Sequence, residues 1–270
     1  IMQLNPGNTI YNDNAEIIID DENVLKFTSK NDLKKIRGGK VSMIFQEPMA
    51  SFAPAIKIGN QMVEQLLLHK DLDKHKAKSI SIDMLNRVGI ADAEKRFNQY
   101  AFELSGGMRQ RAMIAMALST MPKLLLADEP TTALDVTIQA QVINLMKDII
   151  KEFNMGVIFI THDLGVIAQV ADDVAVMYLG SVVERGPVNE ILKNPKHPYT
   201  KGLLNALPDI NNLDAPLKPI PGNIPSPLER PTGCVFRTRC PNPTHDCKEG
   251  NIEMGLIEVE PGHWVDQCCV

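Results

Sequence analysis

One stretch, residues 104–135, constrains this chain more than any other, because it holds two segments suited to binding phosphate and metal. The first segment places Ser105, Gly106 and Gly107 directly before a long apolar run (residues 112–118), which predicts a helix beginning near the serine. The first N–H groups of a helix lack partners and carry the positive end of its dipole, and glycine has no Cβ to keep an anion away. The pattern therefore predicts an anion-binding cradle, although a flexible turn has the same composition.

The second segment, residues 124–130, is a short apolar run that ends in two carboxylates. It predicts a buried strand that delivers Asp128 and Glu129 to the edge of a parallel sheet, where ligands bind. In nucleotide hydrolysis such a pair divides the work. Asp128 would hold Mg²⁺, usually through water, and Glu129 would polarise the attacking water as general base. Alone, an Asp-Glu pair after a strand also fits a solvated loop or a helix cap.

Together with Ala133-Leu134-Asp135, these segments resemble the ATPase subunit of ATP-binding-cassette (ABC) transporters. LSGGMRQR resembles the signature of that family, LLLADE its Walker B strand and ALD its D-loop. The resemblance implies an α/β fold, with a P-loop NTPase (RecA-like) core built on a mostly parallel sheet. It also implies binding of ATP and Mg²⁺, with nucleotide contacts from Ser105, Gly106, Gly107, Gln110, Asp128 and Asp135. Asp135 fits the N-cap of the helix predicted after it as well.

Two more polar residues follow predicted strands. Gln46 comes after residues 41–45, and His162 comes after residues 156–160, which predict a buried strand by their β-branched character. The resemblance identifies Gln46 as the Q-loop glutamine, which contacts the metal or the attacking water. It identifies His162 as the H-loop histidine, whose imidazole contacts the γ-phosphate and the water of Glu129. Without the resemblance, either would be an ordinary polar residue at a strand end.

The rest of the chain predicts two domains. Residues 55–103 have a helical pattern without strand-like alternation, as expected for an inserted helical subdomain. Two strands about the Leu179-Gly180 turn complete an ATPase domain over residues 1–207. Residues 208–270 form a loop-rich extension, since thirteen of the eighteen prolines fall at or after Pro187. Segments within it, and HPYTKGLL (residues 197–204), resemble oligopeptide and dipeptide importer ATPases.

All five cysteines lie at or after Cys234. A reducing compartment favours metal ligation over disulfides, and thiolates among prolines suit an iron–sulfur cluster or zinc. The resemblance implies a [4Fe–4S] cluster on Cys234, Cys240, Cys247 and either Cys268 or Cys269. Free cysteines without a metal are the alternative. Because this proline-rich tail has few apolar residues, we expect ligation to supply much of its local folding energy.

The N-terminal residues predict the end of an apolar helix stopped by Pro6-Gly7. The chain has no match to the phosphate loop G-x-x-x-x-G-K-[ST], since Gly39-Lys40 is followed by Val41. In the family, a segment like residues 1–4 follows that loop closely. We therefore expect an N-terminally truncated subunit that lacks its first strand, its nucleotide-stacking aromatic and the phosphate-neutralising lysine. The intact protein would be a transport ATPase, and this chain would be inactive alone.

Composition limits the partners. A net charge of −5 and a pI near 5.7 give no basic footprint for nucleic acid, and no apolar run is long enough to span a membrane. The resemblance implies a second ATPase subunit in a head-to-tail homo- or heterodimer, transmembrane permease subunits and, indirectly, an extracellular solute-binding protein. The chain would sit on the cytoplasmic face of the membrane as part of a peptide translocase. A non-transport cassette ATPase and a nucleotide-incompetent regulatory or metal-binding module stay open.

Overall fold

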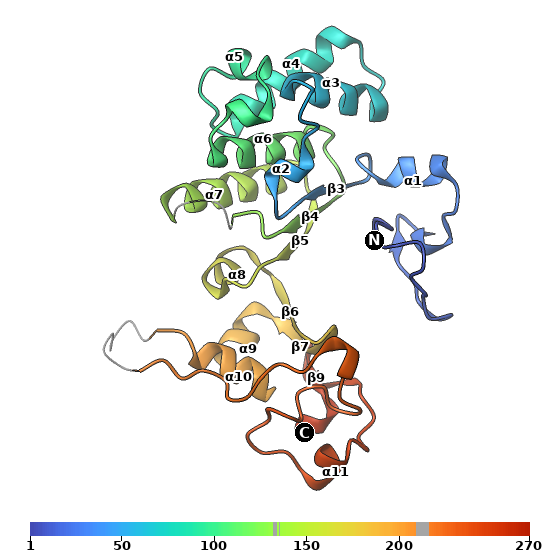
Figure 1. Cartoon of the computed structure of the whole chain (residues 1–270), viewed down its shortest axis with the longest axis vertical. Helices are drawn as coiled ribbons and strands as arrows, with labels where there is room; N and C mark the ends of the chain where they lie inside the picture. The colour runs from blue at the N-terminus through green and yellow to red at the C-terminus, as the bar shows by residue number, and fades with distance from the viewer. Residues whose placement is uncertain (132–133, 135, 209–215) are drawn as a thin grey trace. The chain divides into compact units, whose positions relative to one another are not determined.

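The computed structural model describes residues 1–131, 134, 136–208 and 216–270, which form two compact units, Ile1–His162 and Asp163–Val270 (Figure 1). Asp135, expected in the D-loop and as a helix cap, lies outside the described residues. In the part of the chain that is described, no helix is both long and apolar enough to cross a membrane.

A three-stranded parallel sheet forms the centre of the first unit. Its order is β3 (Val41–Ile44), β4 (Leu124–Asp128) and β5 (Gly156–Ile160). Parallel strands need long crossover connections, and α7 (Val136–Glu152) supplies the one between β4 and β5. The predicted α/β fold with a parallel core sheet is confirmed.

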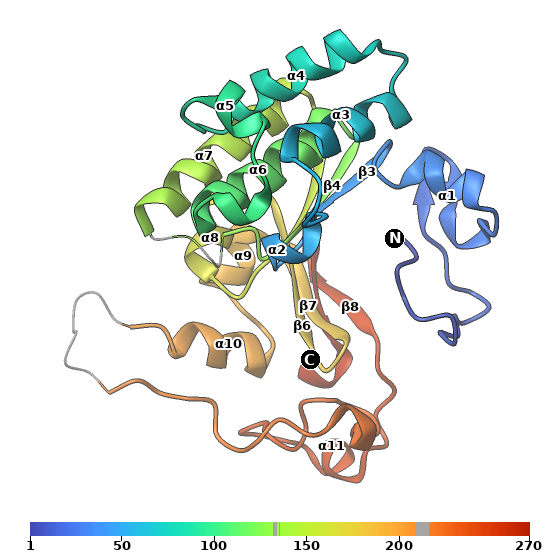
Figure 2. The ribbon, with the colours of Figure 1, turned by 45° about the horizontal axis from the view of Figure 1, so that its top comes forward.

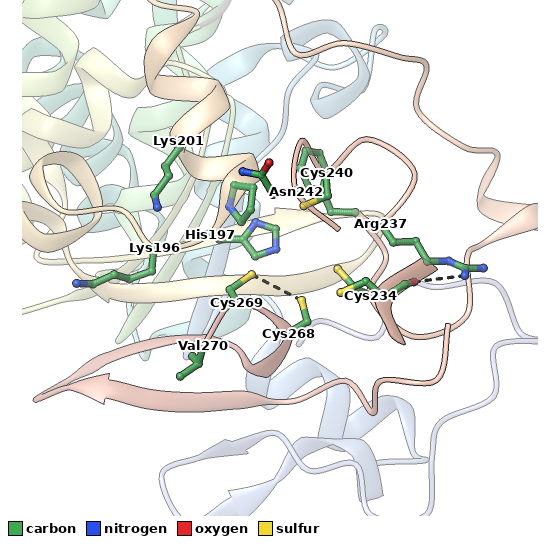
Figure 3. Close-up of a pocket in the computed structure, with 13 residues that line it drawn as sticks. Lys196, His197, Lys201, Cys234, Arg237, Cys240, Asn242, Cys268, Cys269 and Val270 are labelled. Carbon is green, nitrogen blue, oxygen red and sulfur yellow. Dashed lines mark hydrogen bonds between the residues drawn. The ribbon is translucent and has the colours of Figure 1, made fainter. Parts of the chain in front are cut away.

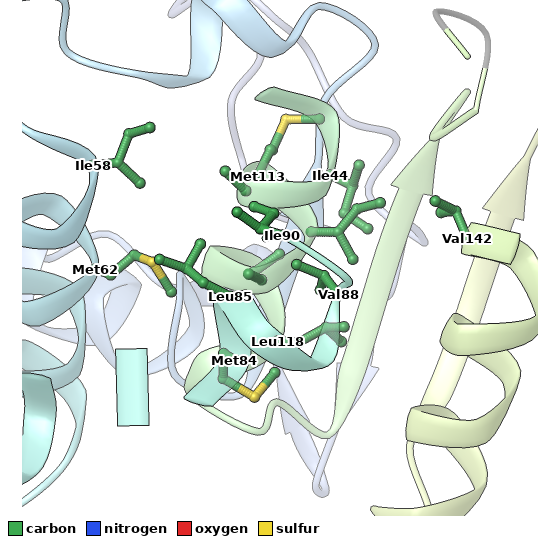
Figure 4. Packing of buried hydrophobic residues seen from close by; sticks show 14 of the residues in the cluster. Ile44, Ile58, Met62, Met84, Leu85, Val88, Ile90, Met113, Leu118 and Val142 are labelled. Atoms are coloured by element: carbon green, nitrogen blue, oxygen red, sulfur yellow. The ribbon is translucent and has the colours of Figure 1, made fainter. Parts of the chain in front are cut away.

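Alternation along the central strand separates two apolar clusters. Leu125 and Ala127 join the large cluster formed with α6 (Gly106–Ser119) and α7, part of which Figure 4 shows. Leu126 joins a smaller cluster with Val24 and Ile36. The strand is therefore covered on both faces, as expected for parallel sheets.

The strand predicted over residues 156–160 is present, but the prediction that it is buried is wrong. Val157 and Phe159 pack on the large cluster, but Ile158 is 43% exposed and Ile160 is 49% exposed. β5 lies at the edge of the sheet, and the smaller cluster covers only β3 and β4. A continuous apolar run therefore does not by itself distinguish a central strand from an edge strand.

Helices account for the segment between β3 and β4. They are α2 (Pro48–Ser51), α3 (Ile58–His69), α4 (Lys74–Arg87) and α5 (Ala93–Phe97), followed by a 3₁₀ turn, η2 (Ala101–Glu103). Met62, Met84 and Leu85 reach the large cluster beside α6 (Figure 4). The helical pattern predicted over residues 55–103 is present.

The helix end predicted for residues 1–10 is wrong, because this segment lies outside any helix. Gln3 has a positive φ of 49°, and the Arg37 guanidinium donates hydrogen bonds to the carbonyls of Met2 and Gln3. These contacts hold the segment against α1 (Lys30–Ile36). The preceding elements are the hairpin β1 (Ile18–Ile19) and β2 (Glu22–Asn23), and the 3₁₀ turn η1 (Val24–Lys26).

An antiparallel sheet organises the second unit, with the order β6-β7-β9-β8. Figure 2 shows three of its strands, β6, β7 and β8. The strands are β6 (Asp173–Tyr178), β7 (Ser181–Pro187), β8 (Leu256–Glu260) and β9 (His263–Asp266). The expected turn joins β6 and β7, with positive φ at Leu179 and Gly180, as in tight hairpins. Since β9 pairs with β7, residues on both sides of the expected 207/208 boundary share one sheet.

Short helices complete this unit: α8 (Leu164–Val170), α9 (Val188–Lys193), α10 (Pro198–Asn205) and α11 (His245–Glu249), with the 3₁₀ turns η3 (Pro227–Glu229) and η4 (Gln267–Cys269). An aromatic cluster anchors the tail, because Phe236 is 1% exposed and packs on Tyr178 and Tyr199 with ring centroids 5.2 and 5.5 Å away. The expectation that little besides a metal orders the tail is therefore wrong.

Candidate nucleotide site and cysteine cavity

Three predicted catalytic residues meet at the carboxyl edge of the parallel sheet. Gln46 follows β3, Glu129 follows β4 and His162 follows β5. The Gln46 amide donates to one Glu129 carboxylate oxygen at 2.9 Å, and His162 Nδ1 lies 3.0 Å from the other. The carboxyl ends of parallel strands must lie at one edge, so the topology brings these residues together.

The backbone at Glu129 is strained, which the sequence did not predict. Its φ is +45°, in the left-handed region that residues other than glycine rarely adopt. The Glu129 N–H donates to the Ile160 carbonyl at 2.9 Å, which fixes this turn to the end of β5. Such strain costs about 1–3 kcal/mol and persists where surrounding contacts enforce it, often at functional sites.

Asp128 ends β4, directly before this turn. It pairs in register with Ile160 and is partly buried. Asp128 and Glu129 are consecutive carboxylates at the end of β4, and carboxylate oxygens are ligands that Mg²⁺ prefers. The geometry thus allows a metal here.

The predicted anion cradle has the expected local structure. Ser105 is the N-cap of α6, and its hydroxyl accepts a hydrogen bond from the Met108 N–H at 3.3 Å. A Cβ added at Gly106 or Gly107 would meet no atom closer than 3.5 Å, so an anion could approach the backbone there. Among the described residues, no hydrogen bond joins these three residues to the group around Glu129.

Gln110, expected to contact nucleotide, is fully buried. Its amide donates to the carbonyl of Pro130, so it ties α6 to the turn after β4. A direct nucleotide contact would require this side chain to leave that carbonyl. Gln110 thus connects the two segments predicted to handle phosphate.

All five cysteines line one cavity of about 310 Å³ in the second unit (Figure 3). Cys234 precedes the buried Phe236, Cys247 lies on α11, and Cys268 and Cys269 lie in η4 with their sulfurs 3.6 Å apart. Lys196, Lys201 and Arg237 line the same cavity. The structure therefore gathers soft ligands from three separate segments.

The environment of three of these thiols, those of Cys234, Cys240 and Cys268, raises their pKa and so favours the protonated form. The neighbouring Cys268 and burial raise the pKa of the Cys234 thiol far above its usual range. For Cys268, the contact with Cys234 lowers the pKa, but the contact with Cys269 and burial outweigh it and raise the pKa overall. Burial also raises the pKa of Cys240. A bound cation would replace these protons, so metal binding here must release them.

Two further buried side chains reach the cysteines. A ring nitrogen of His197, a carboxylate oxygen of Asp266 and the sulfurs of Cys234 and Cys268 all lie within 4.8 Å of one another. Sequence reasoning assigned no role to His197 or Asp266. The His-Pro pair at the start of the HPYTKGLL segment was the available signal for the histidine.

A buried carboxylate supports this side of the cavity. Glu184 on β7 accepts hydrogen bonds from the backbone N–H groups of Lys196 at 2.6 Å and His197 at 3.1 Å. His263 Nε2 lies 2.8 Å from the same carboxylate, and both side chains are fully buried. Glu184 thus joins β7, β9 and the approach to α10.

The sequence matches two protein families. Residues 7–132 match the ABC transporter family, and residues 183–247 match the family described as "Oligopeptide/dipeptide transporter, C-terminal region". The chain is 50% identical over 233 residues to the oligopeptide transport ATP-binding protein AppD of Bacillus subtilis, covering 86% of this chain and 71% of AppD. It is 51% identical over 217 residues to OppD of Haemophilus influenzae, covering 80% of this chain and 67% of OppD.

Solved structures agree on the fold. The dimeric ABC transporter cassette MJ0796 superposes with a TM-score of 0.58 at 25% identity, covering 64% of this chain and 73% of that one. The cassette cbiO1 of Clostridium perfringens superposes with a TM-score of 0.57 at 26% identity, covering 66% of this chain and 68% of cbiO1. The chain belongs to the ATP-hydrolysing subunits of ABC transporters, in the branch that carries the oligopeptide/dipeptide C-terminal region.

Proposed function

We propose that this chain energises the uptake of peptides, or of a related solute, as the ATPase subunit of an ABC importer. The observation that carries the proposal is the convergence of Gln46, Glu129 and His162 at one sheet edge. The relatives at about 50% identity are peptide transport proteins, which favours this function over a non-transport cassette.

The contacts suggest how the work is divided. Gln46 and His162 each hold one oxygen of Glu129, so its carboxylate is oriented before a water arrives. Glu129 would act as the general base, Asp128 and Gln46 would hold Mg²⁺, and His162 would contact the γ-phosphate. Holding the groups in place beforehand lowers the cost of reorganising them during reaction.

The N-terminus of α6 serves a second subunit. Ser105 and Gly106 are exposed, and Gly107 is partly exposed, so the cradle can face a partner. In a head-to-tail dimer, homomeric or heteromeric, these residues complete the partner's nucleotide site, and Asp135 contributes to the same interface. The dimeric form of the MJ0796 cassette supports this arrangement. Permease subunits would then hold the pair at the cytoplasmic face of the membrane, with a solute-binding protein acting outside.

Replacing Glu129 tests the catalytic assignment. The 270 residues contain no phosphate-loop match, so the assay uses a chimera that places the phosphate-loop segment of AppD before Ile1. Glu129→Gln keeps the shape and loses the base, so kcat is expected to fall about 10²- to 10⁴-fold with nucleotide binding retained. Glu64→Gln, at an exposed site on α3, is the matched control and should hydrolyse ATP normally. A Glu129→Gln chimera with the unmodified rate would contradict the assignment.

We also propose that the cysteine cavity holds a [4Fe–4S] cluster, with zinc as the alternative. The donor chemistry fits, because several thiols surround one cavity and three cationic side chains offset the negative charge of thiolates. Cys234, Cys240 and Cys247 are the first three ligands. Cys268 is favoured over Cys269 as the fourth because its sulfur lies within 4.8 Å of Cys234. When bound, the cluster would cross-link these segments and could accept an electron.

Iron analysis of anaerobically purified protein tests this site. About four irons per chain are expected, as that cluster requires. Cys240→Ser should lose the cluster, and Cys268→Ser should lose more iron than Cys269→Ser, which serves as the adjacent control. Stoichiometric zinc without iron would favour a structural zinc site. Full iron content in Cys240→Ser would remove the assignment.

A further inference from the structure

Three contacts hold His197 at the edge of the cysteine cavity. Its Nδ1 accepts a hydrogen bond from the Tyr199 N–H at 3.1 Å, which caps α10. Its backbone N–H donates to Glu184 at 3.1 Å. The Phe236 ring lies against it, with centroids 5.6 Å apart. The cap and the packing against Phe236 leave the ring little freedom to turn.

The cap determines which ring nitrogen carries the proton. Because Nδ1 accepts from Tyr199, it must present its lone pair, so the neutral ring carries its proton on Nε2. Within the described part of the chain, Nε2 is buried and has no hydrogen-bond partner. A buried donor left unpaired destabilises the folded state. An acceptor near Nε2 would remove that cost.

The metal-site residues lie close to this ring. The ring lies on the side of the cavity that also carries Cys234 and Cys268 (Figure 3), and their sulfurs lie within 4.8 Å of a His197 nitrogen. A thiolate at Cys234 would be a stronger acceptor than the thiol.

Direct ligation of a metal by His197 is disfavoured by the same cap. A metal bound at Nε2 needs the lone pair there, which moves the ring proton to Nδ1. That proton would point at the Tyr199 N–H, and the cap of α10 would be lost. Donation from Nε2 keeps the cap and satisfies the buried donor.

We propose that His197 is a positioning residue of the metal site, whose Nε2–H donates a hydrogen bond to the Cys234 sulfur when that sulfur is a ligand. The inference rests on the cluster proposed above. Hydrogen bonds to cluster sulfurs stabilise the more negative, reduced state, so they raise the reduction potential. His197 therefore sets the potential of the site without binding the metal.

Two substitutions separate the roles of the two ring nitrogens. His197→Asn keeps an acceptor for the cap but cannot reach the sulfur, and His197→Gln places an amide N–H near the position of Nε2 while weakening the cap. The full chain is purified anaerobically, and iron content and midpoint potential are measured. Full iron with a more negative potential is expected for His197→Asn, and a potential nearer that of the unmodified chain for His197→Gln.

Three outcomes would overturn the inference. An unchanged potential in a fully loaded His197→Asn chain would show that no hydrogen bond was lost. Stoichiometric zinc that disappears in both His197→Asn and Asp266→Asn would show a four-donor zinc site with Cys234 and Cys268, and His197 as a ligand. An unmodified chain without any metal after reconstitution would refute the cluster itself, and the inference would fall with it.

The tautomer gives a test that needs no substitution. In the metal-free chain labelled with ¹⁵N-histidine, NMR should show the His197 ring protonated at Nε2 and hydrogen-bonded at Nδ1. A ring protonated at Nδ1 would contradict the inference even if both variants failed to fold.

Discussion

Replacing Glu184 by glutamine tests whether one buried carboxylate holds the second unit together. The carboxylate accepts from the backbone N–H groups of Lys196 and His197, and one of its oxygens also contacts His263 at 2.8 Å. Glutamine has the same size but replaces one acceptor oxygen by an NH₂ group, which can only donate. At least one neighbouring N–H group must therefore lose its partner.

The cost follows from the better of two amide orientations. With the NH₂ group facing Lys196 and His263, it would meet two other donors, the Lys196 N–H and the His263 Nε2–H, unless the histidine changed tautomer. With the NH₂ group facing His197, only the backbone N–H of that residue is left unpaired. One unsatisfied buried donor costs about 1–3 kcal/mol, so Glu184→Gln should lower the free energy of unfolding by that amount.

The single tryptophan makes the measurement specific. Trp264 lies on β9, opposite Arg185 of β7, whose guanidinium is 4.8 Å from the ring centroid. Its fluorescence during urea unfolding therefore reports on the second unit. With a slope of about 2 kcal/mol per M, the midpoint should fall by about 0.5–1.5 M. The control is Glu229→Gln, at an exposed site in the same unit. A Glu184→Gln midpoint within about 0.2 M of that control would refute this reasoning.

Two predictions concern the first unit. Gly59→Ala places a methyl group into the Phe97 ring, so it should lower the free energy of unfolding by about 1–3 kcal/mol, and Phe97→Leu should restore part of it. Unfolding followed by circular dichroism would show this, and an unchanged midpoint would contradict it. Hydrogen bonds with Lys123 and Lys40 hold the pKa of Asp20 below its usual range. The unfolded state therefore binds more protons in acid. The ion pairs of Asp20 stabilise the folded state above about pH 4, and this stabilisation is lost as pH falls through the lowered pKa. Asp20→Asn should lower the thermal midpoint at about pH 7 and low salt but not at about pH 2, and equal differences at both would refute the pairing.

Local sequence was sufficient to determine much of the first unit. Ser105 caps α6 because a hydroxyl before two glycines and an apolar run can satisfy the first N–H groups of a helix. Gln46, Glu129 and His162 could be placed together because each follows a strand, and parallel strands end at one edge. These conclusions depend on residues close in the chain and on a topology with few alternatives.

Only the tertiary structure decided how the cysteine site is built. Cys234 and Cys268 are more than thirty residues apart, and no periodicity in the sequence shows that His197 and Asp266 lie beside them. The positive φ of Glu129 and the burial of Gln110 likewise depend on contacts with distant strands and turns. Local pattern fixes where the chain turns and which faces are apolar, but pairings such as that of β9 with β7 depend on which distant surfaces can be buried together.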